Sequence, residues 1–441
     1  MLRVMWLAVV LWCGGMAAAQ VTTGTSARQP GGDPSQVESL KKQVAEQKAE
    51  IQALQAHIAE LARSGSSEAT PKLGSVDAFV EGTAEKSDAR SRIDGLLMGA
   101  KLVGLMDAYF SYNAHQPVSG VSTLRSFDSQ TNQFSLNLIE LGLVKTPTDD
   151  ARMGYNFTLG FGTAMNAVNG ADPGGLRFAQ YLKEGYASYL SPLGHGLEID
   201  FGKFVTPVGA ESIESQNNWN YSRGLLFSYG APFYLFGARA KYEFSDKYSL
   251  TGYLVNGWNN VVDIYSSGKT GGVTFQWRPS RKFGMNETWL VGRGATPADT
   301  GRRNFSSTVV QYSPSSRLAL MANADYGHSS QVTGFSRAVE WSGLAGYARY
   351  QWNPRYSVAA RYEYYNDRDG FTTCEACRSP LPQHVQEWTA TVERRFLQRM
   401  STRIEFRHDR SNQPVFFRAA TPVKDQWTLT AGVMYTLAPS R

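Results

Sequence analysis

Several features that mark other protein classes are missing from this chain of 441 residues. Beyond the N-terminus there is no run of about eighteen apolar residues, which excludes a membrane-spanning helix. Three cysteines exclude both a disulfide-rich scaffold and a zinc site built from two cysteine pairs. The six histidines are scattered, and the sequences Gly-x-Ser-x-Gly and His-Glu-x-x-His do not occur. We therefore expect no enzymatic activity, no metal and no cofactor.

Charge is also scarce, because charged residues make up 19% of the chain and the net charge of +6 is spread along it. The basic residues form no cluster interleaved with aromatic side chains, so we expect no nucleic-acid partner. Aromatic residues and glycine are abundant instead, with 22 Tyr, 22 Phe, 10 Trp and 42 Gly, although the mean hydropathy is −0.34. This combination is typical of a transmembrane β-barrel, in which each strand gives only a weak hydrophobic signal.

The clearest strand pattern lies on both sides of a long polar loop. Apolar and acidic residues alternate over 197–201, and aromatic residues and alanine alternate with charged residues over 234–244. Because side chains alternate across a strand, each of these strands has one apolar face and one charged face. If the sheet closes with its apolar face outward, the loop 206–232 can fold into the opening. That arrangement is a membrane pore with a constriction.

The same unit repeats from residue 99 onward. Runs of alternating residues are joined alternately by tight turns and by long loops, as in a barrel with periplasmic turns and external loops. Counting the runs predicts an all-β fold, a transmembrane antiparallel β-barrel of about sixteen strands over 99–441. Long loops are expected near 113–131, 163–179, 206–232, 257–269, 294–303, 327–339, 366–384 and 410–424.

The N-terminal region divides into four segments before the barrel. Residues 1–19 have the basic, apolar and small-residue parts of a signal peptide. Cys13 raises the alternative of a lipoprotein, but the preceding Trp12 is bulky where a small residue is expected. Residues 20–36 form a flexible linker rich in Gly, Thr, Ser and Pro, and 62–98 form a second polar linker.

Between the two linkers, residues 37–61 show a heptad repeat. Val37, Val44, Ile51 and Ile58 occupy one core position, with mainly leucine at the other. This spacing predicts a short α-helical coiled coil in the periplasm, and the alternative is a single amphipathic helix packed on a domain. The heptad by itself favours a dimer. We nevertheless predict a homotrimer, because three barrels seal part of one another's wall in a compact symmetric interface.

A family resemblance rests on three short segments. The sequences Gly104-Leu-Met-Asp-Ala-Tyr109, Gly202-Lys-Phe-Val-Thr-Pro-Val-Gly209 and Asn256-Gly-Trp258 resemble the OmpL-like β-barrel porins. The resemblance covers roughly residues 100–275 and implies a barrel fold in the bacterial outer membrane. The coiled coil before the barrel also looks like that of some trimeric porins.

Charged side chains at inward positions are the candidate pore residues. Opposed rows of unlike charge would create a transverse field at a constriction, filtering solutes by size and charge. We expect arginines of the later strands on one side and loop carboxylates on the other. The alternative is a solvated channel wall whose charges pair. The candidates are Glu211, Glu214, Arg223, Arg239, Lys241, Arg349, Arg361, Arg403 and Arg407.

The pair Cys374 and Cys377 lies in a predicted external loop. In an oxidising compartment we expect a local disulfide that stiffens the loop. A redox or metal role is the alternative.

The sequence therefore predicts an outer-membrane porin for passive diffusion of small hydrophilic solutes or ions. Its expected partners are outer-membrane lipid, the solutes, two further copies of the chain and the cell wall through the coiled coil. The alternative from another class is a structural anchor, in which the coiled coil links the barrel to the cell wall.

Overall fold

The computed structural model describes residues 99–170, 172, 177–262, 268–293, 301–373, 380–396 and 398–437. The predicted signal peptide, both linkers and the coiled coil lie outside these residues, as do Cys374 and Cys377. Among the described residues, no helix is both long and apolar enough to cross a membrane.

Sixteen strands of the described residues form one closed antiparallel barrel, which confirms the predicted β-barrel of about sixteen strands. The barrel closes because β1 pairs with β2 on one side and with β18 on the other. The wall strands are β1 (Lys101–Asn113), β2 (Gln133–Lys145), β3 (Met153–Phe161), β4 (Leu182–Ser191), β5 (Leu197–Val205), β6 (Tyr234–Ser245), β7 (Tyr248–Val255), β8 (Thr270–Ser280), β9 (Phe283–Arg293), β10 (Arg302–Tyr312), β11 (Leu318–Ser329), β12 (Val339–Asn353), β13 (Tyr356–Asp367), β14 (Gln383–Phe396), β15 (Met400–Ser411) and β18 (Asp425–Thr436).

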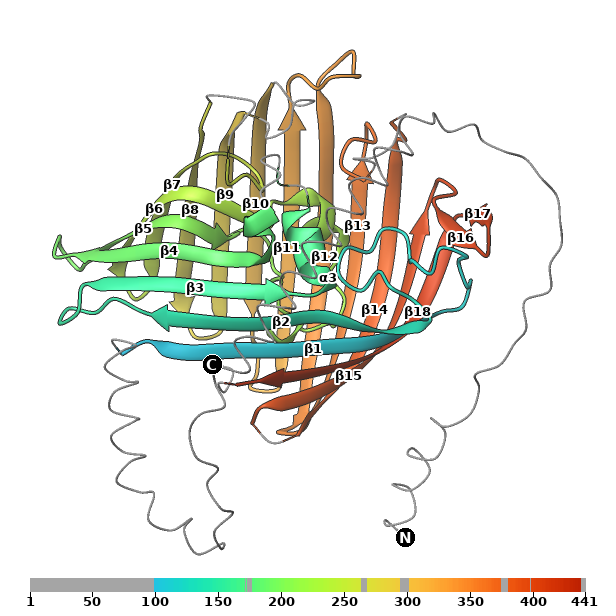
Figure 1. Ribbon diagram of the computed structural model, residues 1–441, viewed down its shortest axis with the longest axis horizontal. Coiled ribbons are helices and arrows are strands. Elements are labelled where there is room, and N and C mark those ends of the chain that lie inside the picture. Colours follow the sequence, from blue (N-terminus) through green and yellow to red (C-terminus); the bar gives the residue numbers. More distant parts are fainter. Residues whose placement is uncertain are drawn as a thin grey trace, which may run out of the picture. The chain divides into compact units, whose positions relative to one another are not determined.

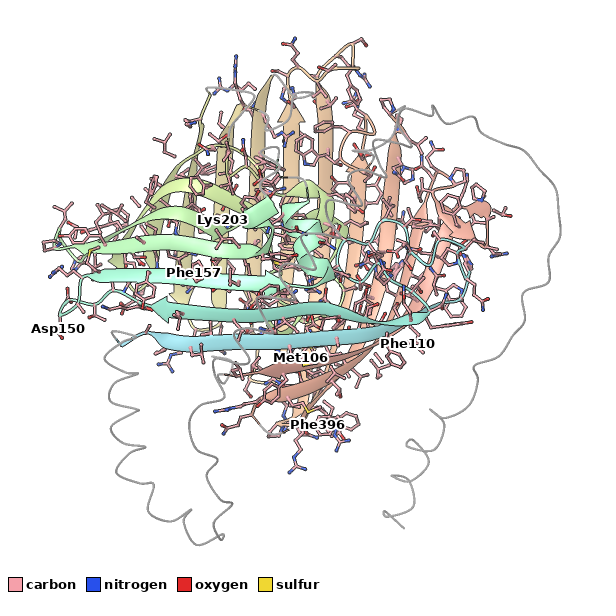
Figure 2. The ribbon with its side chains drawn as sticks, in the orientation of Figure 1. Met106, Phe110, Asp150, Phe157, Lys203 and Phe396 are labelled. Carbon is pink, nitrogen blue, oxygen red and sulfur yellow. The ribbon has the colours of Figure 1, made fainter. Side chains whose placement is uncertain are left out.

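The wall separates an outer apolar face from an inner polar face, most clearly in β13. In β13 the burial alternates strictly, with exposed Tyr362 and Tyr364 beside buried Arg361 and Glu363. Figure 1 shows β1 to β4 crossing in front of β11 to β14, which form the opposite wall. Figure 2 labels Met106 on β1 and Phe157 on β3, two of the exposed apolar side chains. The polar face therefore lines the inside of the barrel, and the apolar face suits lipid.

Short elements that the alternation does not predict lie in the long loops. The helix α3 (Thr163–Asn169) is followed by the 3₁₀ turn η2 (Arg177–Tyr181), and β16 (Phe416–Arg418) pairs with β17 (Thr421–Val423). Met165 and Val168 of α3 are buried in one cluster with Leu138 of β2 and Tyr234 of β6. The cluster corrects the expectation that Tyr234 belongs to the exposed face of its strand, since Tyr234 is fully buried at the start of β6.

Candidate functional site

The loop 206–232 between β5 and β6 is packed almost completely into the interior. It contains the 3₁₀ turn η3 (Ser215–Asn217) and the π-helix η4 (Leu226–Gly230). Asn217 is the only residue of this loop that is exposed, the others being buried or half-buried. Gly209 has a φ of +84°, which supplies the bend that the sequence predicts next to Glu211.

Two carboxylates from the inner wall hold the returning arm of the loop. Glu405 on β15 accepts hydrogen bonds from the backbone N–H groups of Tyr221 (2.5 Å) and Ser222 (3.0 Å). Glu363 on β13 accepts from the N–H groups of Leu225 and Leu226, the latter at 2.7 Å. Each side chain thereby provides acceptors for two buried backbone N–H groups, which fixes this arm of the loop to the wall.

Arg361 anchors the loop through its side chain. Its Nη1 lies 2.5 Å from Oε1 of Glu211 in the loop and donates to the carbonyl of Ser222 at 2.8 Å. Its Nε donates to Oε1 of Glu387 on β14 at 2.5 Å. The guanidinium is thus shared between two carboxylates and a carbonyl, and the pair Arg361–Glu211 ties the loop to β13.

Arg403 and Arg407 on β15 bind the loop mainly through its backbone. Arg403 donates to the carbonyls of Ser215 (2.6 Å), Asn218 (2.7 Å) and Asn220 (2.9 Å). Arg407 donates to the carbonyl of Arg223 at 2.6 Å. Buried backbone carbonyls need hydrogen-bond partners, and the guanidinium fork provides up to five donors. These two arginines therefore replace the water that an exposed loop would bind.

The predicted rows of opposed charge need correction. Glu211 does not face Arg361 across an opening but contacts it directly. Glu214 pairs instead with Lys183 of β4, whose Nζ also lies 2.8 Å from Oε1 of Glu140 on β2. Unlike charges in contact largely cancel at a distance, so these pairs do not generate the expected transverse field. The alternative of a wall whose charges pair describes them better.

Arg223 joins two parts of the loop 206–232 to each other. It donates to the carbonyl of Tyr221 at 2.9 Å and to that of Ile213. Its guanidinium lies 4.5 Å from the ring centre of Phe127, which belongs to the long loop after β1. Arg223 is buried and therefore joins three segments of the interior.

Three of the candidate cations keep contact with water. The side chain of Arg239 is 24% exposed and its Nε lies 2.6 Å from Asp200, while Lys241 is 37% exposed and lies 2.6 Å from Glu243. Arg349 is 22% exposed and lies 3.4 Å from Glu393. The side chains of Arg361, Arg403 and Arg407 are at most 2% exposed. The candidates thus separate into covered anchors and accessible cations.

Asp107 of β1 is a site residue that the sequence prediction lacks. It accepts from the Tyr221 hydroxyl at 2.7 Å, from the Asn137 amide at 2.6 Å and from the Ser215 hydroxyl. Burial, reinforced by this carboxylate, raises the pKa of the Tyr221 hydroxyl well above its ordinary value. The hydroxyl therefore stays protonated and donates to Asp107. Asp107 lies in the segment Gly104–Tyr109, one of the three that carry the family resemblance, and this was the sequence signal for it.

The close approach of Tyr221 depends on a glycine in the wall. A Cβ atom at Gly432 of β18 would lie 2.4 Å from the Tyr221 ring. Farther along the returning arm of the loop, Leu225 and Leu226 are buried in one cluster with Trp341 and Ala345 of β12. The indole N–H of Trp341 also donates to the carbonyl of Gly230 at 3.0 Å. The loop therefore contacts the wall at both ends of the stretch that runs from β12 to β18.

A family model described as "Putative beta-barrel porin-2, OmpL-like" matches residues 99–437. The chain belongs to this family. The match and the barrel support a location in the bacterial outer membrane, and they point to a channel rather than an enzyme. No curated protein matches the chain.

Several solved outer-membrane proteins share the fold at low identity. The anion-selective porin of Comamonas acidovorans has a TM-score of 0.54 and 10% identity, covering 77% of this chain and 99% of that one. The outer membrane channel DcaP of Acinetobacter baumannii has a TM-score of 0.51 and 11% identity, covering 77% and 97%. OmpT of Vibrio cholerae has a TM-score of 0.50 and 10% identity, covering 76% and 97%. At these identities the likeness concerns the fold.

Proposed function

We propose that this member of the family is a porin in which the loop 206–232 narrows the lumen and small hydrophilic solutes or ions diffuse past it. The observation that carries the proposal is the anchoring of the loop. Its backbone and side chains bind inward-facing residues of β1, β13 and β15, inside a closed barrel. Barrels of about sixteen strands leave an aqueous channel, so a loop fixed to the inner wall restricts it.

The division of the wall into covered and accessible parts supports a route for the passage. Arg361, Arg403 and Arg407 are sealed under the loop, whereas Arg239 and Lys241 of β6 remain accessible. We place the passage between the exposed edge of the loop near Asn217 and the wall that contains β6. Cations line this side, each beside a carboxylate, so selectivity by charge should be modest.

Single-channel conductance in a planar bilayer tests the proposal. Deleting residues 212–222 removes the middle of the loop and should raise the conductance of each channel. The control replaces residues 417–422, which are all exposed, by glycine and serine; it keeps the buried Phe416 and should leave the conductance nearly unchanged. Equal conductance of the deletion variant, the control and the parent would place the constriction elsewhere. Stable insertion without any conductance would favour a structural anchor linked to the cell wall.

We also propose a homotrimer with the N-terminal segment in the periplasm. One outward carboxylate supports a protein neighbour on the barrel wall. Glu287 of β9 pairs with Thr308 of β10 and is opposite Phe275 of β8, on the face that also carries exposed Trp289. Glu287 is 9% exposed, and a carboxylate at an outward position is unfavourable next to lipid, so a subunit contact there would explain it. Mass measurement in detergent of the full chain, a Glu287→Leu variant and a chain lacking residues 37–61 tests the trimer. A monomer in every case would refute it.

A further inference from the structure

A polar pocket lies on the outer face of the barrel, where β14 and β15 reach the end that carries the long loops. Its volume is about 320 Å³, and its lining includes His384 and Gln386 of β14, Arg410 of β15, and Lys424. Gln386 and Arg410 are paired in register, and the next outward pair below them is Trp388 and His408. Trp388 is 56% exposed, so the pocket shares the apolar face that suits lipid.

The pocket is held in shape by its rim. The backbone N–H of His384 donates to Oδ1 of Asn412 at 2.8 Å, and the N–H of Asn412 donates to the carbonyl of His384 at 3.2 Å. The His384 ring stacks on Tyr364 with centroids 5.9 Å apart. Arg410 and Lys424 are exposed, and neither forms an ion pair within the described residues. Asp425 is opposite Arg410 in register on β18 and lies 3.6 Å from His408, so the pocket presents two exposed cations beside one carboxylate.

An apolar groove continues below this pocket on the same face. Ala348, Ala360 and Ala390 are paired in register across β12, β13 and β14, so three small side chains form a row. Larger side chains border the row, and it is hollowed by two adjoining spaces of about 480 and 540 Å³ that share Ala348, Ala360, Ala390 and Phe406. The groove therefore extends over the four neighbouring strands β12 to β15.

The spacing between pocket and groove fits an amphiphile. Ala390 and Phe406 are four residues along their strands from Gln386 and Arg410, which is about 14 Å at roughly 3.4 Å per residue. The acyl chains of a phosphate bound in the pocket would then pass Trp388 and His408 and enter the groove. A cation near a membrane surface attracts anionic lipid, and apolar area in the groove adds to binding.

We propose that the outer face of β12–β15 is a binding site for a phosphorylated lipid with two or more acyl chains. Arg410 and Lys424 bind the phosphate, His384 and Gln386 contribute hydrogen bonds, and the groove over Ala360 and Ala390 receives the chains. This site is separate from the loop inside the barrel. The lipid would bind at a fixed stoichiometry, unlike the exchanging lipid around the rest of the wall.

Native mass spectrometry of the full chain in a non-ionic detergent tests the headgroup. The probe is phosphatidylglycerol, compared with diacylglycerol, which has the same chains without phosphate, and glycerol phosphate, which has no chains. Replacing both cations, Arg410→Gln with Lys424→Gln, should weaken phosphatidylglycerol binding roughly 30-fold. The control Arg302→Gln removes an exposed cation from the same end of β10 and should leave binding unchanged.

A second pair of variants tests the groove. Ala360→Leu with Ala390→Leu fills it and should displace the lipid, whereas Ala238→Leu with Ala240→Leu on the outward face of β6 should not. Heat-modifiable gel mobility and conductance of all variants should match the parent, because the sites lie outside the lumen.

Three results would overturn the proposal. They are equal phosphatidylglycerol binding by the double-cation variant, equal binding of diacylglycerol, and competition by glycerol phosphate at the concentration at which phosphatidylglycerol competes.

Discussion

The inner wall has two regions that look alike in sequence and differ in the structure. Arg361 on β13 and Arg239 on β6 both occupy inward positions in alternating strands, and each has an acidic partner. The side chain of Arg361 is fully buried, whereas that of Arg239 is 24% exposed. The difference is the loop 206–232, which covers one region and leaves the other accessible. An inward charge thus either anchors the loop or faces the lumen.

Burial changes what each charge contributes. A buried ion pair gains little over an apolar pair of the same shape, but removing one partner leaves a buried charge and costs about 3–5 kcal/mol. An exposed pair contributes about 0–1 kcal/mol and is screened by salt. The covered region should therefore govern stability, and the accessible region should govern conduction.

The largest expected effect is the loss of Arg361. The change Arg361→Met leaves the carboxylate of Glu211 buried without its cation and Glu387 with Arg407 alone, and should lower the free energy of unfolding by about 3–5 kcal/mol. Lys241→Met in the accessible region is the control, with an expected loss of about 0–1 kcal/mol. Urea unfolding in detergent, followed by heat-modifiable mobility, measures both. Similar losses of unfolding free energy in Arg361→Met and Lys241→Met would mean that the covered and accessible regions do not differ in their contribution to stability.

The next effect compares the two faces of the accessible wall. Ala238 on β6 pairs with Phe201, which is 64% exposed on the outer face. The change Ala238→Arg places a charge in lipid and should cost about 2–4 kcal/mol near the bilayer midplane. Gln276→Arg adds the same side chain to the inner face of β8 and should cost much less. If the inner substitution is the more damaging one, the assignment of faces is wrong.

The strand pattern could be predicted from the sequence because alternation is a local property. A run such as 356–367 shows its two faces within a single strand. The alternation of tight turns and long loops then predicts that successive strands are antiparallel neighbours. The cover over Arg361 is not local, since Glu211 lies 150 residues away. Gly209 and the apolar run after Gly224 indicated that the loop bends inward, but not which residues it binds. The elements α3, β16 and β17 were missed because they are too short to show a period.

A smaller effect is expected where the loop meets the wall through a glycine. In Gly432→Ala the new Cβ would overlap the buried ring of Tyr221, which also packs against Tyr109. Overpacking of this kind typically costs about 1–3 kcal/mol. Gly252→Ala on the outer face of β7 adds the same atom to open space and serves as the control. Unfolding midpoints measure the difference, and a loosened loop should add current noise in Gly432→Ala alone.

The smallest effect concerns ion selectivity, and it contrasts a charge in each region. Lys241→Glu reverses a charge that faces water. It should raise the cation-to-anion permeability ratio about two- to five-fold at 0.1 M salt, which corresponds to a change of about 0.5–1 kcal/mol in the electrostatic energy of a passing ion. The double change Glu211→Gln with Glu214→Gln should shift the ratio towards anions by less, because both carboxylates are paired and covered. Reversal potentials across a salt gradient measure both variants. At 1 M salt the screening length falls to about 3 Å, so the effect of Lys241→Glu should nearly vanish. A larger shift from the loop pair than from Lys241→Glu would mean that ions pass beside Glu211 and that the covered wall, not the β6 wall, lines the passage.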